Sequence, residues 1–252
     1  MLDELELKAR RLVQRAAYYF KPQPLFKALS VEQIFGSQQG LGLVQQFNDL
    51  WYRSGVAGEL NWKGDPVLKN PCDLWMVLEL FQRLRPAAIV ETGTHRGGSA
   101  SFYADMLRVL EISGTVITVD MNPKWTFDPK SKGIVSIIGY STDSGSVAKV
   151  ASAVGAATAR ASGPVIVVLD SDHTKANVER ELELYAPFVS VGSYLIVEDT
   201  NINGHPSSPE FGPGPWEAVT EFLQSRTDFV PDSECERFLL TFNPRGWLKR
   251  VA

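Results

Sequence analysis

The sequence predicts an α/β protein whose main domain is doubly wound, with a mostly parallel sheet. From residue 71 onward, short apolar runs alternate with stretches of helical periodicity. The runs lack the alternation of apolar and polar residues that marks a half-exposed strand, which indicates a sheet buried on both faces. Several runs end directly in an acidic residue, and ligands of such sheets bind beyond the carboxyl ends of the strands.

Composition and charge narrow the class of protein further. The 252 residues are 44% hydrophobic and 21% charged, as in ordinary soluble globular proteins, and the net charge of −4 argues against nucleic acid as a partner. Cys72 and Cys235 are too far apart for a metal-ligand spacing or a disulfide framework. The charged N-terminus has no signal-peptide core, and no run approaches the roughly 18 apolar residues of a membrane span. We therefore expect a cytoplasmic protein.

Residues 1–70 are expected to form an N-terminal layer of helix and loops that serves as a lid or an oligomer contact. In the first 20 residues, leucines recur at helical spacing among charges, which predicts an amphipathic helix. Such a helix packs on its own domain or on a second subunit more often than on a membrane. We therefore expect a homo-oligomer. Residues 21–70 are irregular and rich in glycine, proline and aromatic residues.

The main domain is expected to span residues 71–252. The periodicity predicts helices over 73–84, 99–111, 146–160, 175–185 and 215–224. Apolar runs predict strands over 87–93, 115–120, 134–140, 164–170, 193–199, 237–242 and 247–251, with an antiparallel element at the C-terminal end.

A glycine-rich turn follows the first of these strands, in the stretch IVETGTHRGGSA (89–100). Its G-x-x-x-G-G spacing differs from the dinucleotide-binding fingerprint and from a P-loop. Gly93 and Gly97 lack a Cβ, so the backbone there is able to approach a ligand closely. Glu91 would repel a pyrophosphate but suits a cationic ligand. The alternative is a turn that closes an αβ unit, with Glu91 solvated.

S-adenosylmethionine (SAM) combines a sulfonium and an ammonium with two ribose hydroxyls, and Asp120 ends the next strand, where acids accept hydrogen bonds from ribose. We therefore predict a SAM site. The residues expected to hold SAM are Glu91, Gly93, Thr94, Gly97, Ser99 and Asp120, with Asp170 beside them and Ser141, Thr142 and Asp143 near the adenine.

Acidic residues also end two later strands of the predicted sheet. Asp170 ends one strand, and Glu198 and Asp199 end the next. Consecutive strands of such a sheet usually lie side by side, so the three carboxylates are expected to cluster and to need a cation between them. Oxygen ligands favour Mg²⁺, then Mn²⁺ or Ca²⁺, and disfavour zinc. The alternative is solvated acids or helix caps, with Asp172 as a cap.

His173 follows Asp170 by three residues and is expected to act as a general base, since a hydroxyl near a divalent ion becomes more acidic. A helix-terminal histidine and a direct metal ligand are the alternatives. A further alternative combines His173, His205 and Asp170 as a non-haem iron site. That arrangement leaves Glu198 and Asp199 without a role.

Six motifs resemble one known family, the cephalosporin hydroxylase/rhamnosyl O-methyltransferase family. They are NPCDLW (70–75), IVETGTHRGGSA (89–100), LDSDH (169–173), IVED (196–199), FGPGPWEAV (211–219) and FLLTFNPRGWLKR (238–250). The resemblance spans about residues 60 to 252. It implies a Rossmann-like methyltransferase fold and a SAM-dependent, Mg²⁺-assisted O-methyltransferase. It also places the metal on Asp170, Glu198 and Asp199, and the base at His173.

The expected substrate is a small hydroxylated acceptor, such as a sugar or another natural product with a hydroxyl group. Trp62 and Trp216 are candidate stacking surfaces for a sugar, with core packing as the alternative. Two other classes of function remain as alternatives: a non-haem iron hydroxylase, and a non-catalytic partner protein that binds SAM.

Overall fold

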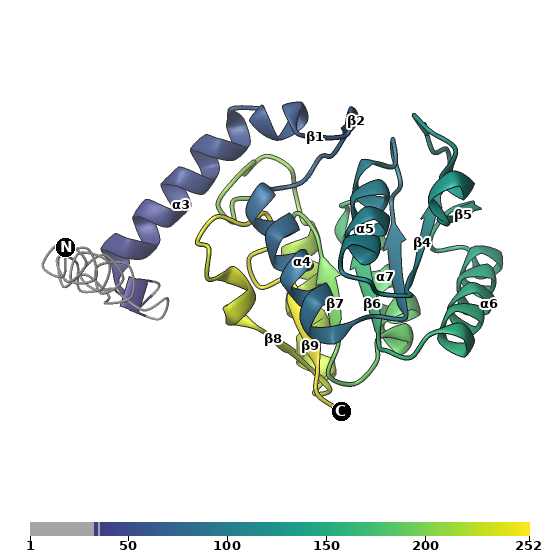
Figure 1. Cartoon of the computed structure of the whole chain (residues 1–252). Helices are drawn as coiled ribbons and strands as arrows, with labels where there is room; N and C mark the ends of the chain where they lie inside the picture. The colour runs from purple at the N-terminus through teal and green to yellow at the C-terminus, as the bar shows by residue number, and fades with distance from the viewer. Residues whose placement is uncertain (1–32, 35) are drawn as a thin grey trace, which may run out of the picture. The chain divides into compact units, whose positions relative to one another are not determined.

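A computed structural model of the chain describes residues 33, 34 and 36–252. The chain divides into two compact units, Met1–Leu41 and Gly42–Ala252. Helix α3 (Gln38–Arg53) begins in the first unit and ends in the second. The amphipathic helix predicted for the first 20 residues lies outside the described residues. The sheet and the helices that pack on it belong to the second unit (Figure 1).

The described part of the second unit contains one seven-stranded sheet. In spatial order its strands are β5 (Val135–Ile138), β4 (Thr115–Asp120), β3 (Ala88–Thr92), β6 (Val165–Leu169), β7 (Tyr194–Val197), β9 (Trp247–Arg250) and β8 (Phe229–Pro231). The first five strands are parallel, and β9 pairs antiparallel with β7 and β8. The predicted doubly wound fold with an antiparallel C-terminal element is therefore confirmed.

Helices cover both faces of the sheet, which explains why the strands are continuously apolar. The helices are α4 (Pro71–Leu84), α5 (Gly98–Val109), α6 (Ser144–Arg160), α7 (Lys175–Tyr185) and α8 (Pro215–Ser225). One hydrophobic cluster joins α4 and α5 to alternate strand residues such as Ile89 and Ile166. A second cluster joins α6, α7 and α8 to the intervening residues, such as Val90 and Val167. Both sets of strand side chains thus lie in a core.

The shorter elements are β1 (Asn61–Trp62), β2 (Asp65–Pro66) and the 3-10 helices Val56–Glu59, Pro129–Lys132, Ala186–Phe188 and Ser233–Glu236. Among the helices that the structure describes, none has the length and apolar composition needed to cross a membrane.

Local sequence signals fix the start of α4 and with it the preceding residue, Lys69. The Asn70 side chain caps the helix by accepting a hydrogen bond from the Cys72 N–H at 2.8 Å, and Pro71 occupies the first turn. The helix ends at Leu84 and is followed by the C-cap residue Arg85, which adopts a left-handed conformation with φ 49°. Because the cap holds Asn70 in place, the backbone of Lys69, the residue before it, is held in a defined position.

The segment just before α4 is tied to α5 by Asp105. The Trp62 indole N–H donates to the Asp105 carboxylate at 2.9 Å, and the Lys63 ammonium lies 2.9 Å from the same oxygen. Burial acts to raise the pKa of Asp105, but hydrogen bonds from Lys63 and Trp62 outweigh it and hold that pKa well below its usual value. These contacts fix the loop that leads to Lys69.

The strand predicted over 237–242 is wrong. Leu239 has a φ of 66°, which an extended strand does not allow. The strand that pairs with β9 at the edge of the sheet is instead β8, at Phe229–Pro231. The segment is instead bound to helices: the Asn48 side chain donates to the Leu239 carbonyl at 3.1 Å, and Asp73 accepts from the Phe242 N–H at 2.8 Å. Polar side chains of α3 and α4 thus take the place of a neighbouring strand.

Candidate functional site

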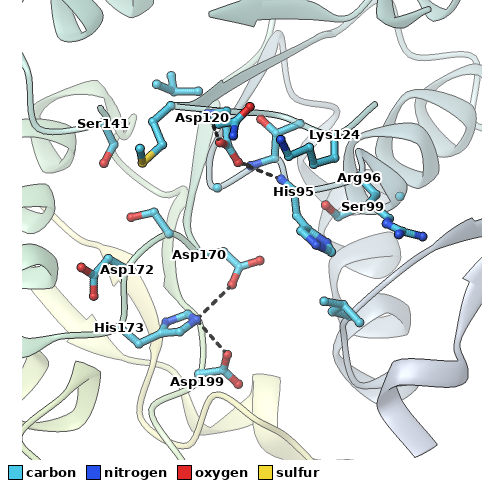
Figure 2. A pocket seen from close by; sticks show the side chains of 18 of the residues that line it. His95, Arg96, Ser99, Asp120, Lys124, Ser141, Asp170, Asp172, His173 and Asp199 are labelled. Carbon is cyan, nitrogen blue, oxygen red and sulfur yellow. Dashed lines mark hydrogen bonds and ion pairs between the residues drawn. The ribbon is translucent and has the colours of Figure 1, made fainter. Parts of the chain in front are cut away.

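A cavity of about 730 Å³ opens at the carboxyl ends of the parallel strands (Figure 2). Eight of the predicted site residues line it: Gly93, Thr94, Ser99, Asp120, Ser141, Asp170, His173 and Asp199. Five others do not: Glu91, Gly97, Thr142, Asp143 and Glu198. The strand ends therefore meet at one cavity, as the parallel sheet predicts.

The two glycines of the first loop serve close packing within the protein. Both have positive φ, 80° at Gly93 and 82° at Gly97. A Cβ at Gly93 would lie 1.8 Å from the Asp170 carbonyl oxygen, and a Cβ at Gly97 would lie 2.2 Å from the Trp125 ring. The sequence predicted a close approach of ligand at these positions, whereas the nearest neighbours are protein atoms.

Asp120 ends β4 and organises the same loop. One of its carboxylate oxygens accepts hydrogen bonds from the N–H groups of Thr94 at 2.9 Å and His95 at 2.8 Å. The other accepts from the Asn122 N–H at 2.7 Å. A carboxylate has about four acceptor positions, so this side chain retains capacity for a ligand hydroxyl in the cavity it lines.

The wall near the end of β5 is partly apolar. Ser141 is buried and lines the cavity, and its carbonyl accepts a hydrogen bond from the Tyr185 hydroxyl at 2.8 Å. Met121 and Tyr140 also line the cavity, although no sequence pattern distinguishes them from core residues. Asp143 is exposed at the start of α6 and does not line the cavity.

Glu91 is a fully buried carboxylate, and neither of its oxygens has a hydrogen bond of ordinary length and angle with a described residue, although Ser99 is near enough to lower its pKa. Its nearest cation is the Lys69 ammonium at 4.0 Å. Burial raises the pKa of Glu91 to about 8, against the lowering influence of Lys69. Buried polar atoms without partners are rare, so this side chain marks a position where a cationic or hydrogen-bonding ligand would be stabilised.

Lys69 lies at the centre of the acidic cluster and was not selected from the sequence. Its ammonium is 2.6 Å from an Asp170 oxygen and 3.0 Å from a Glu198 oxygen. Burial acts to lower the pKa of Lys69, but the charges of Asp170 and Glu198 outweigh it and raise that pKa well above its usual value. The lysine follows Val67 and Leu68 just before a helix start, but only the fold shows which acids it meets.

A second group of side chains gathers on the cavity side of Asp170. The His173 Nε2 atom lies 3.2 Å from an Asp199 oxygen and 3.8 Å from the second Asp170 oxygen (Figure 2). One ligand atom from each of these three residues lies within 4.8 Å of the others, a spacing that suits a metal ion. Glu198 faces Lys69 instead. The predicted set of three acids is thus divided, with Asp170 shared by both groups.

Backbone geometry separates the adjacent acids Glu198 and Asp199. The Glu198 N–H continues the sheet by donating to the Leu169 carbonyl at 3.0 Å. Asp199 then adopts a φ of 55°, and its N–H donates to the Asn243 side chain at 3.0 Å. Burial raises the pKa of Asp199 to about 6, while the neighbouring His173 acts to lower it. The turn therefore directs Asp199 to the imidazole.

Asp172 and His205 have structural partners. Asp172 lines the cavity and accepts a hydrogen bond from the Thr174 N–H at 2.9 Å, which is a turn ahead of α7 rather than a helix cap, because the N-cap residue of α7 is Thr174. His205 lies 3.0 Å from Glu217 and stacks on the Trp216 ring at 4.3 Å. Among the described residues, the possible metal cluster includes His173 but not His205, so the geometry does not favour the iron site.

The two candidate stacking tryptophans contact protein side chains. Besides His205, the Trp216 ring has the Arg245 guanidinium over it at 5.0 Å. Trp62 packs edge-to-face on Phe102 at 5.2 Å. The alternative of a packing role thus fits both residues.

Comparison with known proteins gives the family. The family model described as rhamnosyl O-methyltransferase/CmcI matches residues 54–251. The chain belongs to this family. The resemblance inferred from the six motifs is confirmed, and the matched range includes Lys69 and every predicted site residue.

Individual members of the rhamnosyl O-methyltransferase/CmcI family agree with this assignment. A rhamnosyl O-methyltransferase of Mycobacterium tuberculosis is 33% identical over 210 residues, which cover 82% of this chain and 85% of the relative. That of Mycobacterium leprae is 31% identical over 230 residues, which cover 87% and 98%. A Mg–SAM structure of CmcI has a TM-score of 0.57 and 22% identity over 77% of this chain and 78% of its own, which supports the fold.

Replacing Glu91 by glutamine in this family member is expected to change how stability depends on pH. Since the folded pKa lies near 8 and the usual value is 4.5, the folded state binds the proton more tightly than the unfolded state. The free energy of unfolding of the wild type therefore falls as pH rises from about 5 to 8, and the variant escapes this loss.

Urea unfolding of both proteins between pH 5 and 8 would check this. The Glu91→Gln variant is expected to be more stable at pH 8 by about 3 kcal/mol, with little difference at pH 5. A difference in the free energy of unfolding between the two proteins that does not vary with pH would contradict the assignment of a raised pKa to Glu91.

Proposed function

We propose that the chain transfers the methyl group of SAM to a hydroxyl of a sugar or another hydroxylated natural product, assisted by a divalent ion, with Mg²⁺ as the first choice. The observation that carries this proposal is the meeting of Asp170, His173 and Asp199 in one cavity whose other wall holds Asp120. The names of the mycobacterial relatives and the Mg–SAM structure of CmcI support the same reaction class.

The residues at or near the carboxyl ends of β3, β4 and β5 fit SAM. The oxygens of Glu91, which lack a hydrogen bond of ordinary geometry with a described residue, favour a positively charged group nearby, such as the ammonium or sulfonium. Asp120 has acceptor positions left for the ribose hydroxyls. The wall that contains Met121, Tyr140 and Ser141 suits a flat, partly apolar adenine. Donor-site roles for Gly93, Thr94, Gly97, Ser99 and Asp143 remain predictions.

The acids at the ends of β6 and β7 fit a divalent ion. Asp170 and Asp199 would hold it, while Glu198, which faces Lys69, stays a predicted third ligand. Carboxylate oxygens suit Mg²⁺ better than zinc. When bound, such an ion makes a nearby hydroxyl more acidic and offsets the charge of the carboxylates.

His173 is proposed to accept the proton of the acceptor hydroxyl. Its Nε2 atom faces the cavity between two carboxylates, and when those carboxylates hold a divalent ion instead, a neutral imidazole would have Nε2 free to take the proton. As the proton moves to Nε2, the acceptor oxygen forms a bond to the methyl carbon of SAM. The bond from that carbon to sulfur breaks, and its electron pair stays on sulfur, which becomes a neutral thioether.

The N-terminal layer, residues 1–70, is proposed to contribute to the acceptor pocket. Pro66, Leu68 and Lys69 line the cavity, which supports a contribution to the pocket from at least this part of the layer. The cytoplasmic location and the homo-oligomer expected from the sequence remain predictions.

Calorimetry with SAM, with and without Mg²⁺, would test the proposal together with methylation of a panel of rhamnosides followed by mass spectrometry. SAM is expected to bind, and methyl transfer is expected to stop when a chelator removes the ion. Equal turnover with and without chelator would remove the metal from the proposal, and absence of SAM binding would remove the donor. SAM binding without turnover on any hydroxylated acceptor would favour the non-catalytic partner protein.

A further inference from the structure

Lys69 differs from every other cationic residue that the structure describes. It is the only buried lysine or arginine among them, with 3% of its surface exposed. Lysine is rarely buried this far unless it is paired with an acid, because removing the ammonium from water is costly. The burial of Lys69 therefore needs an explanation other than a contribution to solubility.

The contacts of Lys69 link the predicted donor site to the predicted metal site. Its ammonium lies 2.6 Å from Asp170, 3.0 Å from Glu198 and 4.0 Å from Glu91. Asp170 presents one oxygen to Lys69 and the other to His173. The orientation of the Asp170 carboxylate toward the cavity is thus set from behind by the lysine.

The backbone keeps the ammonium in this position. Val67 is 1% exposed, and its N–H donates to the Leu60 carbonyl at 2.8 Å. On the other side, Asn70 is fully buried and caps α4. Because Val67 and Asn70, on either side of Lys69, are both fixed, Lys69 cannot move away from the acids without a change in the fold around it.

We propose that Lys69 is a positioning residue: a resident counter-ion that orients Asp170 and Glu198 and limits the affinity of the cluster for a divalent ion. This inference rests on the proposed function, since it concerns the same acidic cluster. A fixed positive charge repels a divalent ion a few ångströms away, and the repulsion is strong where water is excluded. The lysine also keeps Glu198 engaged and so reserves the cavity side of the cluster for Asp170 and Asp199.

Replacing Lys69 by methionine would test the inference, because methionine retains an unbranched side chain and removes the charge. The Mn²⁺ dissociation constant of the purified full chain would be measured by electron paramagnetic resonance at neutral pH. We expect Lys69→Met to bind Mn²⁺ at least about tenfold more tightly than wild type. Structural damage would loosen a metal site, so tighter binding distinguishes a counter-ion from a residue needed only for folding.

Lys124→Met is the matched control. Lys124 lines the same cavity but pairs with no carboxylate in the described part of the chain, so its loss is expected to change the Mn²⁺ affinity less than about threefold. If Lys69→Met does not fold, the double variant Lys69→Met/Glu198→Gln replaces the ion pair by neutral groups. It would then be compared with Glu198→Gln alone and is expected to bind Mn²⁺ about tenfold more tightly.

The outcomes separate this inference from the proposed function. If the wild type binds Mn²⁺ as tightly as the Lys69 variant, or more tightly, the counter-ion role is overturned and the proposed function is not affected. Binding by the Lys69 variant but not by wild type supports the counter-ion role and removes the metal from the proposed function. Absence of binding in both proteins overturns both.

Discussion

Replacing Asp170 by asparagine is expected to abolish methyl transfer and to weaken divalent-ion binding by about a hundredfold or more. Asp170 is the residue shared by the two groups of the site, with one oxygen near Lys69 and the other near His173. Asparagine keeps the shape of the side chain but loses its charge. The effect would be measured as turnover on a rhamnoside acceptor and as the Mn²⁺ dissociation constant.

The effect of Asp170→Asn on SAM is expected to be small, since Glu91 and Asp120 lie on other strands. Asp172→Asn is a matched control two residues away: an asparagine side chain forms the same turn with the Thr174 N–H as aspartate does, so turnover should stay within about threefold of wild type. Chelator-sensitive turnover that survives Asp170→Asn would contradict the assignment of this acid to the metal.

His173→Ala is expected to lower kcat by about a hundredfold or more, the usual contribution of a general base. The acceptor KM should change much less, because the imidazole acts on the proton rather than on the body of the substrate. Steady-state kinetics over a range of pH would check this. Raising the pH should restore part of the lost turnover, since hydroxide is able to replace the missing base.

His205→Ala is the control for His173→Ala. His205 contacts Glu217 and Trp216 and does not line the cavity, so its removal should leave kcat within about threefold. An unchanged kcat in His173→Ala would remove this residue as the base. A large increase in acceptor KM at constant kcat would assign it to binding instead.

The sheet and its acids were predictable because they depend on local patterns. Apolar runs such as 164–170 and 193–199 form parallel strands that end side by side, so the meeting of Asp170 with Asp199 follows from their order in the chain. The glycine turn after β3 was predictable for a similar reason, since few residues other than glycine adopt its positive φ.

The partners of buried charges were not predictable in the same way. Lys69 and Glu198 are 129 positions apart, and no periodicity relates them. The mistaken strand over 237–242 has a similar cause: its apolar composition matches a strand, but contacts with Asn48 and Asp73, far away in sequence, hold it in another conformation. Long-range contacts override local preference in both cases.

The division between Glu198 and Asp199 has a consequence for how this chain tolerates change in length. Because Glu198 and Asp199 directly follow β7, deleting one residue from this strand would move Asp199 into the position of Glu198 and Thr200 into the position of Asp199. Lys69 would then face the shorter acid, and the imidazole would lose its carboxylate neighbour. We therefore expect insertions and deletions to be far less tolerated at this strand than in the loop that follows it.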